Sequence, residues 1–227
     1  MSSSSLKGRV VLVTGASRGL GRAVAAAATR AGARIIALAR TKAALEELDD
    51  EMRADGLDVT LLPLDVLDGD SIDRLGLSIG QRFGRLDGFV HCAAELGPLT
   101  PTAQLDPATL ARVMAVNALS AQRLIRSLDP LFRLSDGARL VFLSDGNATS
   151  QRPFWAAYAA SKNALAAIAS AYAAEVEKTA IRVKWLDPGP MATRLRRAAY
   201  PGDADDARPH PREAAAKVLE LLAAERS

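Results

Sequence analysis

Short runs of apolar and β-branched residues alternate along this chain with longer, alanine-rich stretches whose apolar positions recur at helical spacing. The short runs predict six strands, at Arg9 to Val13, Arg34 to Ala39, Asp58 to Leu64, Leu86 to Cys92, Arg139 to Ser144 and Ile181 to Leu186. The longer stretches predict helices over Gly19 to Ala31, from a cap at Thr41 to Ala54, over Asp70 to Phe83, from Pro107 behind an Asp106 cap to Leu128, over Phe154 to Lys178, and from Pro211 almost to the C-terminus.

The predicted strands are too apolar to leave one face of a sheet in water. Their alternation with helices predicts an α/β fold, with a parallel sheet of six strands and helices on both faces. The sequence has no internal repeat or linker, so we expect a single domain over residues 1–227, with residues 1–6 as a flexible tail. The irregular stretch 194–210 follows a strand and predicts a substrate lid, with a loop of no functional consequence as the alternative.

Composition narrows the class of protein. The chain has 227 residues, of which 49% are hydrophobic, which suits one α/β domain with a sizeable core. A net charge of +3, from 29 basic and 26 acidic residues, is too small to predict binding to nucleic acid or to an anionic membrane. The single cysteine, the polar N-terminus and the lack of a long apolar segment favour a cytoplasmic protein. No metal site is expected.

The most specific local pattern is the glycine-rich segment from Thr14 to Gly21, between the first strand and the first helix. Gly15 permits a sharp turn, Gly19 allows close approach of a pyrophosphate, and Gly21 allows the helix to pack tightly on the strand. The helix N-terminus then offers free N–H groups and a positive dipole to the phosphates. The candidate cofactor-binding residues of this segment are Gly15, Ser17, Arg18, Gly19, Leu20 and Gly21.

The glycine spacing in this context resembles that of the short-chain dehydrogenase/reductase family, and the similarity extends over roughly Lys7 to Leu222. The resemblance implies a Rossmann-type, doubly wound sheet that binds a nicotinamide dinucleotide. Proteins that bind NAD usually place an acid at the end of the second strand, where this chain has Arg40. Arg40 and Arg18 suit the 2′-phosphate of NADP, so NADP(H) is expected in preference to NAD(H).

Further cofactor contacts follow from the same resemblance. Asp65 and Val66 stand where the family holds adenine, Ala93 stands in the family's Asn-Asn-Ala-Gly segment, and Pro188, Gly189 and Thr193 match the segment that meets the nicotinamide amide. In that Asn-Asn-Ala-Gly segment this chain departs from the family with His91 and Cys92. We interpret His91 as a hydrogen-bonded core histidine and Cys92 as a small buried residue.

The strongest chemical signal is the pair Tyr158 and Lys162, which lie four residues apart on one face of a predicted helix. An adjacent ammonium lowers the pKa of a phenol and makes it usable as an acid or base. In the family, the lysine also holds the nicotinamide ribose, and an asparagine at a helix kink, here Asn117, helps a water connect to that lysine. Tyr158, Lys162 and Asn117 are therefore candidate catalytic residues.

The family's remaining catalytic group, a serine thirteen positions before the tyrosine, is replaced by Asp145. The serine donates a hydrogen bond to the substrate carbonyl, and loss of one such donor typically costs ~3 kcal/mol. An ionised Asp145 at ~4 Å would add repulsion of about 4 kcal/mol at an effective dielectric constant near 20. Three ways out remain open: the neighbouring Ser144 replaces the missing donor with the help of Gly146, Asp145 acts as a protonated donor, or the substrate is cationic. Ser144 is the candidate retained.

These observations predict an NADP(H)-dependent oxidoreductase that transfers a hydride between nicotinamide and a small carbonyl or alcohol substrate. The rival is a catalytically weakened or inactive NADP(H)-binding sensor or scaffold of the same fold, because Asp145 departs from the catalytic pattern. Family members usually continue past the last helix into a further strand, whereas this chain ends at Ser227. We therefore expect a more exposed sixth strand and a homodimer formed through the two long helices, Pro107 to Leu128 and Phe154 to Lys178.

Overall fold

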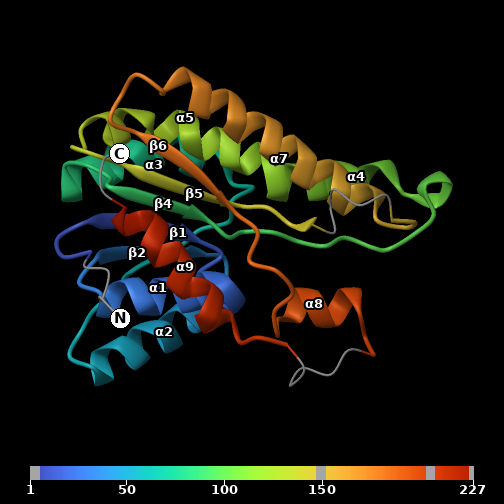
Figure 1. The fold of residues 1–227 in the computed structure, drawn as a ribbon, viewed down its shortest axis with the longest axis horizontal. Helices are drawn as coiled ribbons and strands as arrows, with labels where there is room; N and C mark the ends of the chain where they lie inside the picture. The colour runs from blue at the N-terminus through green and yellow to red at the C-terminus, as the bar shows by residue number, and fades with distance from the viewer. Residues whose placement is uncertain (1–5, 147–151, 203–207, 225–227) are drawn as a thin grey trace.

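The computed structural model describes residues 6–146, 152–202 and 208–224. It contains a parallel sheet of six strands in the order β3-β2-β1-β4-β5-β6, flanked by helices (Figure 1). The strands are β1 (Val10–Thr14), β2 (Arg34–Ala39), β3 (Thr60–Pro63), β4 (Gly88–His91), β5 (Arg139–Leu143) and β6 (Arg182–Leu186). The helices described are α1 (Gly19–Arg30), α2 (Lys42–Ala54), α3 (Gly69–Phe83), α4 (Pro107–Met114), α5 (Ser120–Arg133), α7 (Ala156–Glu175), α8 (Arg194–Ala199) and α9 (Pro211–Ala223), with the short turns η1 (Thr102–Gln104) and η2 (Ala115–Leu119).

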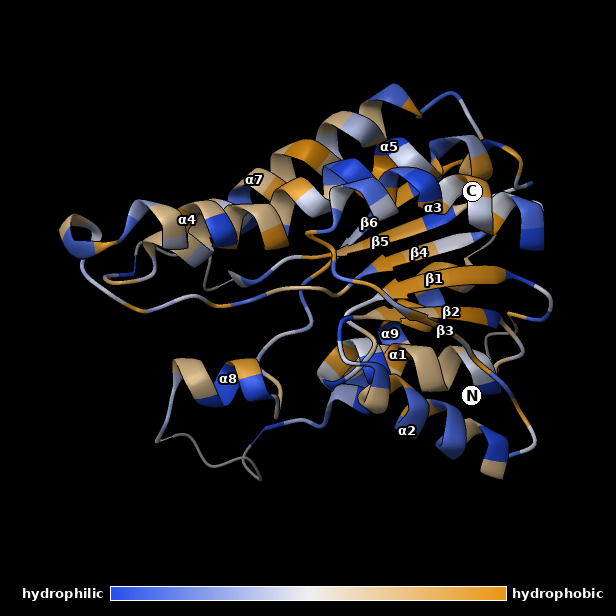
Figure 2. Ribbon diagram, turned by 180° about the vertical axis from the view of Figure 1, so that it is seen from behind, coloured by the Kyte–Doolittle hydropathy of each residue, from blue (hydrophilic) through white to orange (hydrophobic). Residues whose placement is uncertain are grey.

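The sheet is buried on both faces because successive side chains of each strand point to opposite sides. In β1, Val10 and Leu12 pack with α3, α5 and α7, whereas Val11 and Val13 pack with α1, α2 and α9. Figure 1 shows these two sets of helices on opposite faces of the sheet, and Figure 2 shows that the central strands are almost uniformly hydrophobic. The predicted α/β fold, with helices on both faces of six strands, is confirmed.

Strands β2 and β3 are added on one side of β1, and β4, β5 and β6 are added on its other side, so the strand order switches between β1 and β4. β1 pairs with β2 on one side and with β4 on the other, all in parallel. A crevice therefore opens beyond the carboxyl ends of β1 and β4, which is where doubly wound sheets bind ligands.

The predicted helix from Pro107 to Leu128 is interrupted. Asp106 caps it as expected, since its carboxylate accepts the N–H of Thr109, but the residues of η2 form a π-helical turn and α5 continues beyond Leu128 to Arg133. A π-turn inserts extra backbone into the helix. Apolar spacing does not reveal it, because α4 and α5 each keep an ordinary helical period.

Several predicted boundaries are also wrong. Thr41 stands at the start of α2, but its side chain makes no capping hydrogen bond. β3 spans only the four residues that pair with β2, which is shorter than predicted. α7 begins at Ala156 because Phe154 has a φ of 74°, which a right-handed helix cannot contain.

The ends of the chain show two further differences. Leu6 is not part of a flexible tail: its side chain is fully buried and its N–H donates to the carbonyl of Ala31, while residues 1–5 lie outside the described residues. The stretch 194–210 contains the short helix α8, and residues 203–207 lie outside the described part. The residues of β6 are only partly buried or exposed, as predicted for an edge strand. Within the described residues, none of the helices is long and apolar enough to cross a membrane.

Candidate active site

A cavity of about 460 Å³ lies beyond the carboxyl ends of the strands. Its walls are formed by the segments that follow all six strands, together with the start of α7 and the residues of α8. Every candidate cofactor-binding residue from the sequence lines it, and so do Tyr158, Lys162 and Ser144. Asn117 lies behind the wall, fully buried. The fold thus gathers residues that are widely separated in the sequence at one site.

The glycine-rich segment forms a cradle at one end of this cavity. Gly21 has to be a glycine, because a Cβ there would lie 2.3 Å from the carbonyl oxygen of Gly15. Gly15 has a φ of +65°, and a Cβ there would lie 2.9 Å from the backbone nitrogen of Ala93. At Gly19 a Cβ would meet only the Thr193 side chain, at 3.6 Å, so the start of α1 is open to the cavity. This geometry fits a dinucleotide pyrophosphate at a helix N-terminus.

Thr14 joins the glycine-rich segment to the residues that follow β4. The sequence patterns did not predict this role. The Thr14 hydroxyl accepts the backbone N–H groups of Cys92 and Ala93, both at 3.1 Å, and lies 3.2 Å from Nδ1 of His91. The only signal in the sequence is a hydroxyl residue directly before the first glycine. Its role depends on β1 and β4 being neighbours, which the sequence does not reveal.

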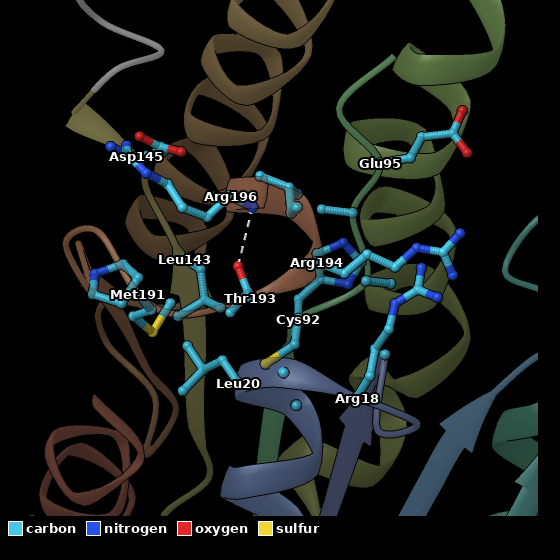
Figure 3. A pocket seen from close by; sticks show the side chains of 18 of the residues that line it. Arg18, Leu20, Cys92, Glu95, Leu143, Asp145, Met191, Thr193, Arg194 and Arg196 are labelled. Carbon is cyan, nitrogen blue, oxygen red and sulfur yellow. Dashed lines mark hydrogen bonds between the residues drawn. The ribbon is translucent and has the colours of Figure 1, made fainter. Parts of the chain in front are cut away.

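Two arginines lie at the end of the cavity formed by β1 and β2. Arg18 is exposed and belongs to the glycine-rich segment, and Arg40 follows β2 with half of its side chain exposed. The Arg40 guanidinium lies 3.9 Å from the carboxylate of Asp65. Figure 3 shows the Arg18 side chain beside the glycine-rich turn. These residues fit the adenosine end of a phosphorylated dinucleotide.

Tyr158 and Lys162 face the cavity from one side of α7, as predicted. The Lys162 ammonium donates to the carbonyl oxygen of Leu143 at 2.6 Å, and burial lowers its pKa. The pKa of Tyr158 is raised well above its usual value by burial and by the charge of Asp145. The predicted direction of the Tyr158 shift is therefore wrong. Desolvation and the Asp145 carboxylate both favour the neutral phenol.

Asp145, rather than Ser144, contacts the tyrosine. The Tyr158 hydroxyl donates to Oδ2 of Asp145 at 2.9 Å, and the backbone N–H of Ser144 donates to the carbonyl of Leu186. Both residues line the cavity. The carboxylate of Asp145 therefore occupies the position beside Tyr158 for which the sequence analysis retained Ser144 as the donor.

Asn117 lies in the π-turn η2, as the resemblance implies for an asparagine at a helix kink. Its Oδ1 accepts the N–H of Glu95, and its Nδ2 donates to the carbonyl of Glu95 and to the Ser161 hydroxyl. Asn117 thus joins the segment after β4 to α7, on which Tyr158 and Lys162 lie. In the structure its contacts are to backbone and Ser161, one residue from Lys162.

His91 is a core residue, as predicted, whereas Cys92 is only partly buried and lines the cavity, so its prediction as a buried residue is wrong. His91 is 2% exposed, and burial together with the nearby Lys162 lowers its pKa to about 3, so it is neutral. Its Nε2 makes no hydrogen bond to any described residue. Desolvation raises the pKa of the Cys92 thiol to about 12, which disfavours the thiolate.

The far end of the cavity is aromatic and basic. Trp155 packs against Tyr158 and Tyr200, with ring centroids 5.8 Å apart in both pairs, and Leu195 of α8 joins this cluster. Thr193 caps α8 by accepting the N–H of Arg196, as Figure 3 shows. The segment that follows β6 therefore contacts both ends of the cavity: Thr193 lies beside Gly19 of the glycine-rich turn, and Leu195 packs in the cluster that contains Tyr158.

Comparison with known proteins agrees with this site. The family model of the short chain dehydrogenases matches residues 9–204. The uncharacterised oxidoreductase YciK of Escherichia coli is 34% identical over 199 residues, which cover 86% of this chain and 79% of the relative. The benzil reductase ((S)-benzoin forming) of Saccharomyces cerevisiae is 32% identical over 197 residues, covering 84% and 74%. The chain spans about three fifths of the length of several other curated relatives.

A solved structure of a relative contains a cofactor. The short chain dehydrogenase homologue from Escherichia coli CFT073, complexed with NADPH, superimposes with a TM-score of 0.93 at 32% identity, and the match covers 98% of this chain and 93% of the other. With the family model, the glycine-rich cradle and the Tyr158–Lys162 pair in one cavity, the chain belongs to the short-chain dehydrogenase/reductase family.

Proposed function

We propose that this protein is an NADP(H)-dependent oxidoreductase that transfers a hydride between nicotinamide and a carbonyl or alcohol substrate. The observation that carries the proposal is the presence of Tyr158 and Lys162 in the same cavity as the glycine-rich cradle. The benzil reductase among its relatives acts on a carbonyl compound, which agrees with this substrate class.

The chain's own residues supply binding, orientation and proton transfer. When bound, the nicotinamide donates or accepts the hydride. Gly15, Gly19 and Gly21 leave room for the pyrophosphate, and Lys162, held by the Leu143 carbonyl, is placed to hold the ribose. The Tyr158 hydroxyl lines the cavity and is proposed to exchange a proton with the substrate oxygen; its raised pKa keeps it protonated before substrate binds.

The preference for NADP(H) over NAD(H) rests on Arg18 and Arg40 at the adenosine end of the cavity. A 2′-phosphate between two guanidinium groups makes charge-assisted hydrogen bonds that a 2′-hydroxyl does not. The NADPH-bound relative supports the same preference. The stretch around α8 is proposed to close over the substrate, because Leu195 and Tyr200 already contact the cluster beside Tyr158.

A second candidate function is favoured by one observation. Asp145 accepts a hydrogen bond from Tyr158 at 2.9 Å, so the tyrosine hydroxyl proposed for proton transfer is already engaged. A protein that binds NADP(H) as a sensor or scaffold, with weak or no catalysis, would tolerate such a contact. It would have no need of a buried lysine beside the tyrosine, and for this reason we place it second.

The decisive experiment combines NADPH titration with turnover on a panel of aldehydes, ketones and cyclic imines. The loss in Tyr158→Phe is measured against the wild type on the aldehydes and ketones. We expect Tyr158→Phe to bind NADPH within about twofold of the wild type and to lose about 100-fold or more in turnover, because the proton donor is removed. Tight binding without turnover of any compound would favour the second candidate. Failure to bind NADPH would overturn both.

A further inference from the structure

The feature that the proposed function does not explain is the carboxylate of Asp145 beside the reacting end of the cavity. Its Oδ2 lies 2.9 Å from the Tyr158 hydroxyl, and its side chain lines the cavity. We propose that the substrate carries a cationic nitrogen at its reacting bond, so that the enzyme interconverts an iminium ion and an amine, with Asp145 as the residue that binds this nitrogen. The inference rests on the NADP(H)-dependent hydride transfer of the proposed function, and it replaces the C=O bond of the substrate by a C=N bond at the same site.

The charge around Tyr158 supports a cationic substrate. Asp187, after β6, also lines the cavity, and its two oxygens accept the backbone N–H groups of Gly146 and Gly189 at 2.9 and 2.8 Å. These contacts fix a second carboxylate next to the loop that carries Asp145. Besides burial, the charges of Asp145 and Asp187 raise the pKa of Tyr158, and Asp145 also contacts its hydroxyl. A substrate oxygen that becomes negative would be repelled here, whereas a positive nitrogen is attracted.

The protein already places a cation on this side of the cavity. Figure 3 shows the side chain of Arg196, from α8, pointing toward Asp145. The guanidinium carbon of Arg196 lies 3.6 Å from the centre of the Tyr200 ring, so it is held by an aromatic face. Arg196 shows that a cation with an aromatic neighbour is tolerated on this side of the cavity, and a substrate cation at Asp145 would take the place that Arg196 approaches.

The reaction balances without a proton donor from the protein. The iminium carbon accepts the hydride from the reduced nicotinamide, a C–H bond forms, and the π electrons of the C=N bond become the lone pair of the amine nitrogen. The nitrogen enters with its proton, so Tyr158 does not have to release its own. In the reverse direction the neutral amine loses a hydride to the oxidised cofactor and leaves as the iminium ion. Asp145 favours the protonated, electrophilic form of the imine.

A matched pair of ligands tests the inference by binding alone. Calorimetry of the NADP⁺-loaded protein compares protonated 1,2,3,4-tetrahydroisoquinoline with the neutral α-tetralol of similar size. We expect the wild type to bind the amine at least 10-fold more tightly than the alcohol, and Asp145→Asn to lose this preference. Equal binding of the two ligands by the wild type, or an unchanged preference in Asp145→Asn, would overturn the inference.

Turnover gives an independent readout with the corresponding substrates, 3,4-dihydroisoquinoline and α-tetralone. The wild type should reduce the imine and leave the ketone almost unchanged, whereas Asp145→Ser should lose the imine activity and gain about 100-fold on the ketone, since the serine hydroxyl restores a donor. A wild type that reduces the ketone and loses this activity in Asp145→Ser would show that Asp145 is a protonated donor, which overturns the inference but leaves the proposed function intact. Absent NADPH binding would instead overturn the proposed function.

Discussion

At the scale of single residues, the proposed preference for NADP(H) over NAD(H) rests on Arg18 and Arg40. Both are exposed at the adenosine end of the cavity, and each can give a hydrogen bond to a charged phosphate worth ~1.5–3 kcal/mol. We expect Arg18→Ala and Arg40→Ala each to weaken NADPH binding about 10- to 100-fold and to change NADH binding by less than about threefold. Fluorescence titration with both cofactors measures this, with Arg74→Ala, exposed on α3, as the control. Equal losses for both cofactors would place the arginines elsewhere on the dinucleotide.

We expect His91 to make the free energy of unfolding depend on pH between pH 6.5 and 4.5, a range in which few other side chains titrate. Its pKa is lowered to about 3 by burial, whereas in the unfolded chain it returns to about 6.5. As the pH falls below 6.5 only the unfolded state takes up this proton, so stability falls by up to ~1.4 kcal/mol per pH unit. Between pH 6.5 and 4.5 the loss amounts to about 2 kcal/mol.

Urea unfolding of the wild type and of His91→Asn at several pH values measures this effect. The variant keeps a polar group beside Thr14 and should lose most of the slope between pH 6.5 and 4.5. The carboxyl groups of Glu51, Asp73 and Asp129, whose pKa values are lowered by arginine partners, act only at lower pH. An equal slope in wild type and variant would mean that His91 is protonated in the folded state.

At the scale of elements, the sequence predicts which strands and helices exist better than where they begin and end. β2 was predicted to the residue because Ile35 to Ala39 is an uninterrupted apolar run that starts shortly after Gly32 and ends before the polar start of α2. The π-turn η2 was missed because it changes backbone hydrogen bonding and leaves the apolar pattern unchanged. The start of α7 was misplaced because the backbone of Phe154 depends on its surroundings.

For the candidate site, too, local patterns were predicted and contacts between distant segments were not. The glycine-rich segment and the Tyr158–Lys162 pair were predicted because their spacing is local, within one turn or one helix. The role of Thr14 and the contact between Asp145 and Tyr158 join separate elements, so they required the order of the strands. The direction of the Tyr158 pKa shift was wrong for a similar reason, since burial depends on the whole cavity.

Asn117 joins the π-turn to two other parts of the active site, the segment after β4 and helix α7. It is fully buried and satisfies both backbone groups of Glu95 as well as the Ser161 hydroxyl. Asn117→Ala leaves the two backbone groups of Glu95 without their partner, whereas the Ser161 hydroxyl still donates to the carbonyl of Tyr158. Each buried group without a partner costs about 1–3 kcal/mol. We expect a loss of about 2–5 kcal/mol in the free energy of unfolding, measured by urea denaturation.

The matched control for this prediction is Ser161→Ala, which removes one partner of Asn117 and should cost about 1 kcal/mol. If Asn117→Ala were no more destabilising than Ser161→Ala, the contacts with Glu95 would be replaced by water. The cavity would then be more open to solvent behind Lys162 than the structure indicates.

At the scale of the whole molecule, two arginines bind the end of the last helix to the amino ends of β1 and β5, on the side of the sheet away from the cavity. Arg9 donates to the carbonyl of Leu222, and the buried Arg139 donates to that of Ala224, at the end of α9. α9 packs along α1, whose N-terminus forms the cofactor cradle. The end of the described chain therefore supports the helix on which the dinucleotide site is built.

The outward face of α7 is where the proposed dimer can be tested. Ala160, Ala167, Ala171 and Ala174 are exposed at helical spacing on this face, and small side chains allow two helices to approach closely. In a twofold dimer through α7, Ala167→Glu places two unpaired charges in the interface, each costing several kcal/mol. We expect light scattering at micromolar concentration to show a dimeric wild type and a monomeric Ala167→Glu variant. The control is Ala43→Glu, which changes an exposed alanine on α2 and should remain dimeric. A dimeric Ala167→Glu variant would place the interface on another face of the molecule. A monomeric wild type would exclude the dimer.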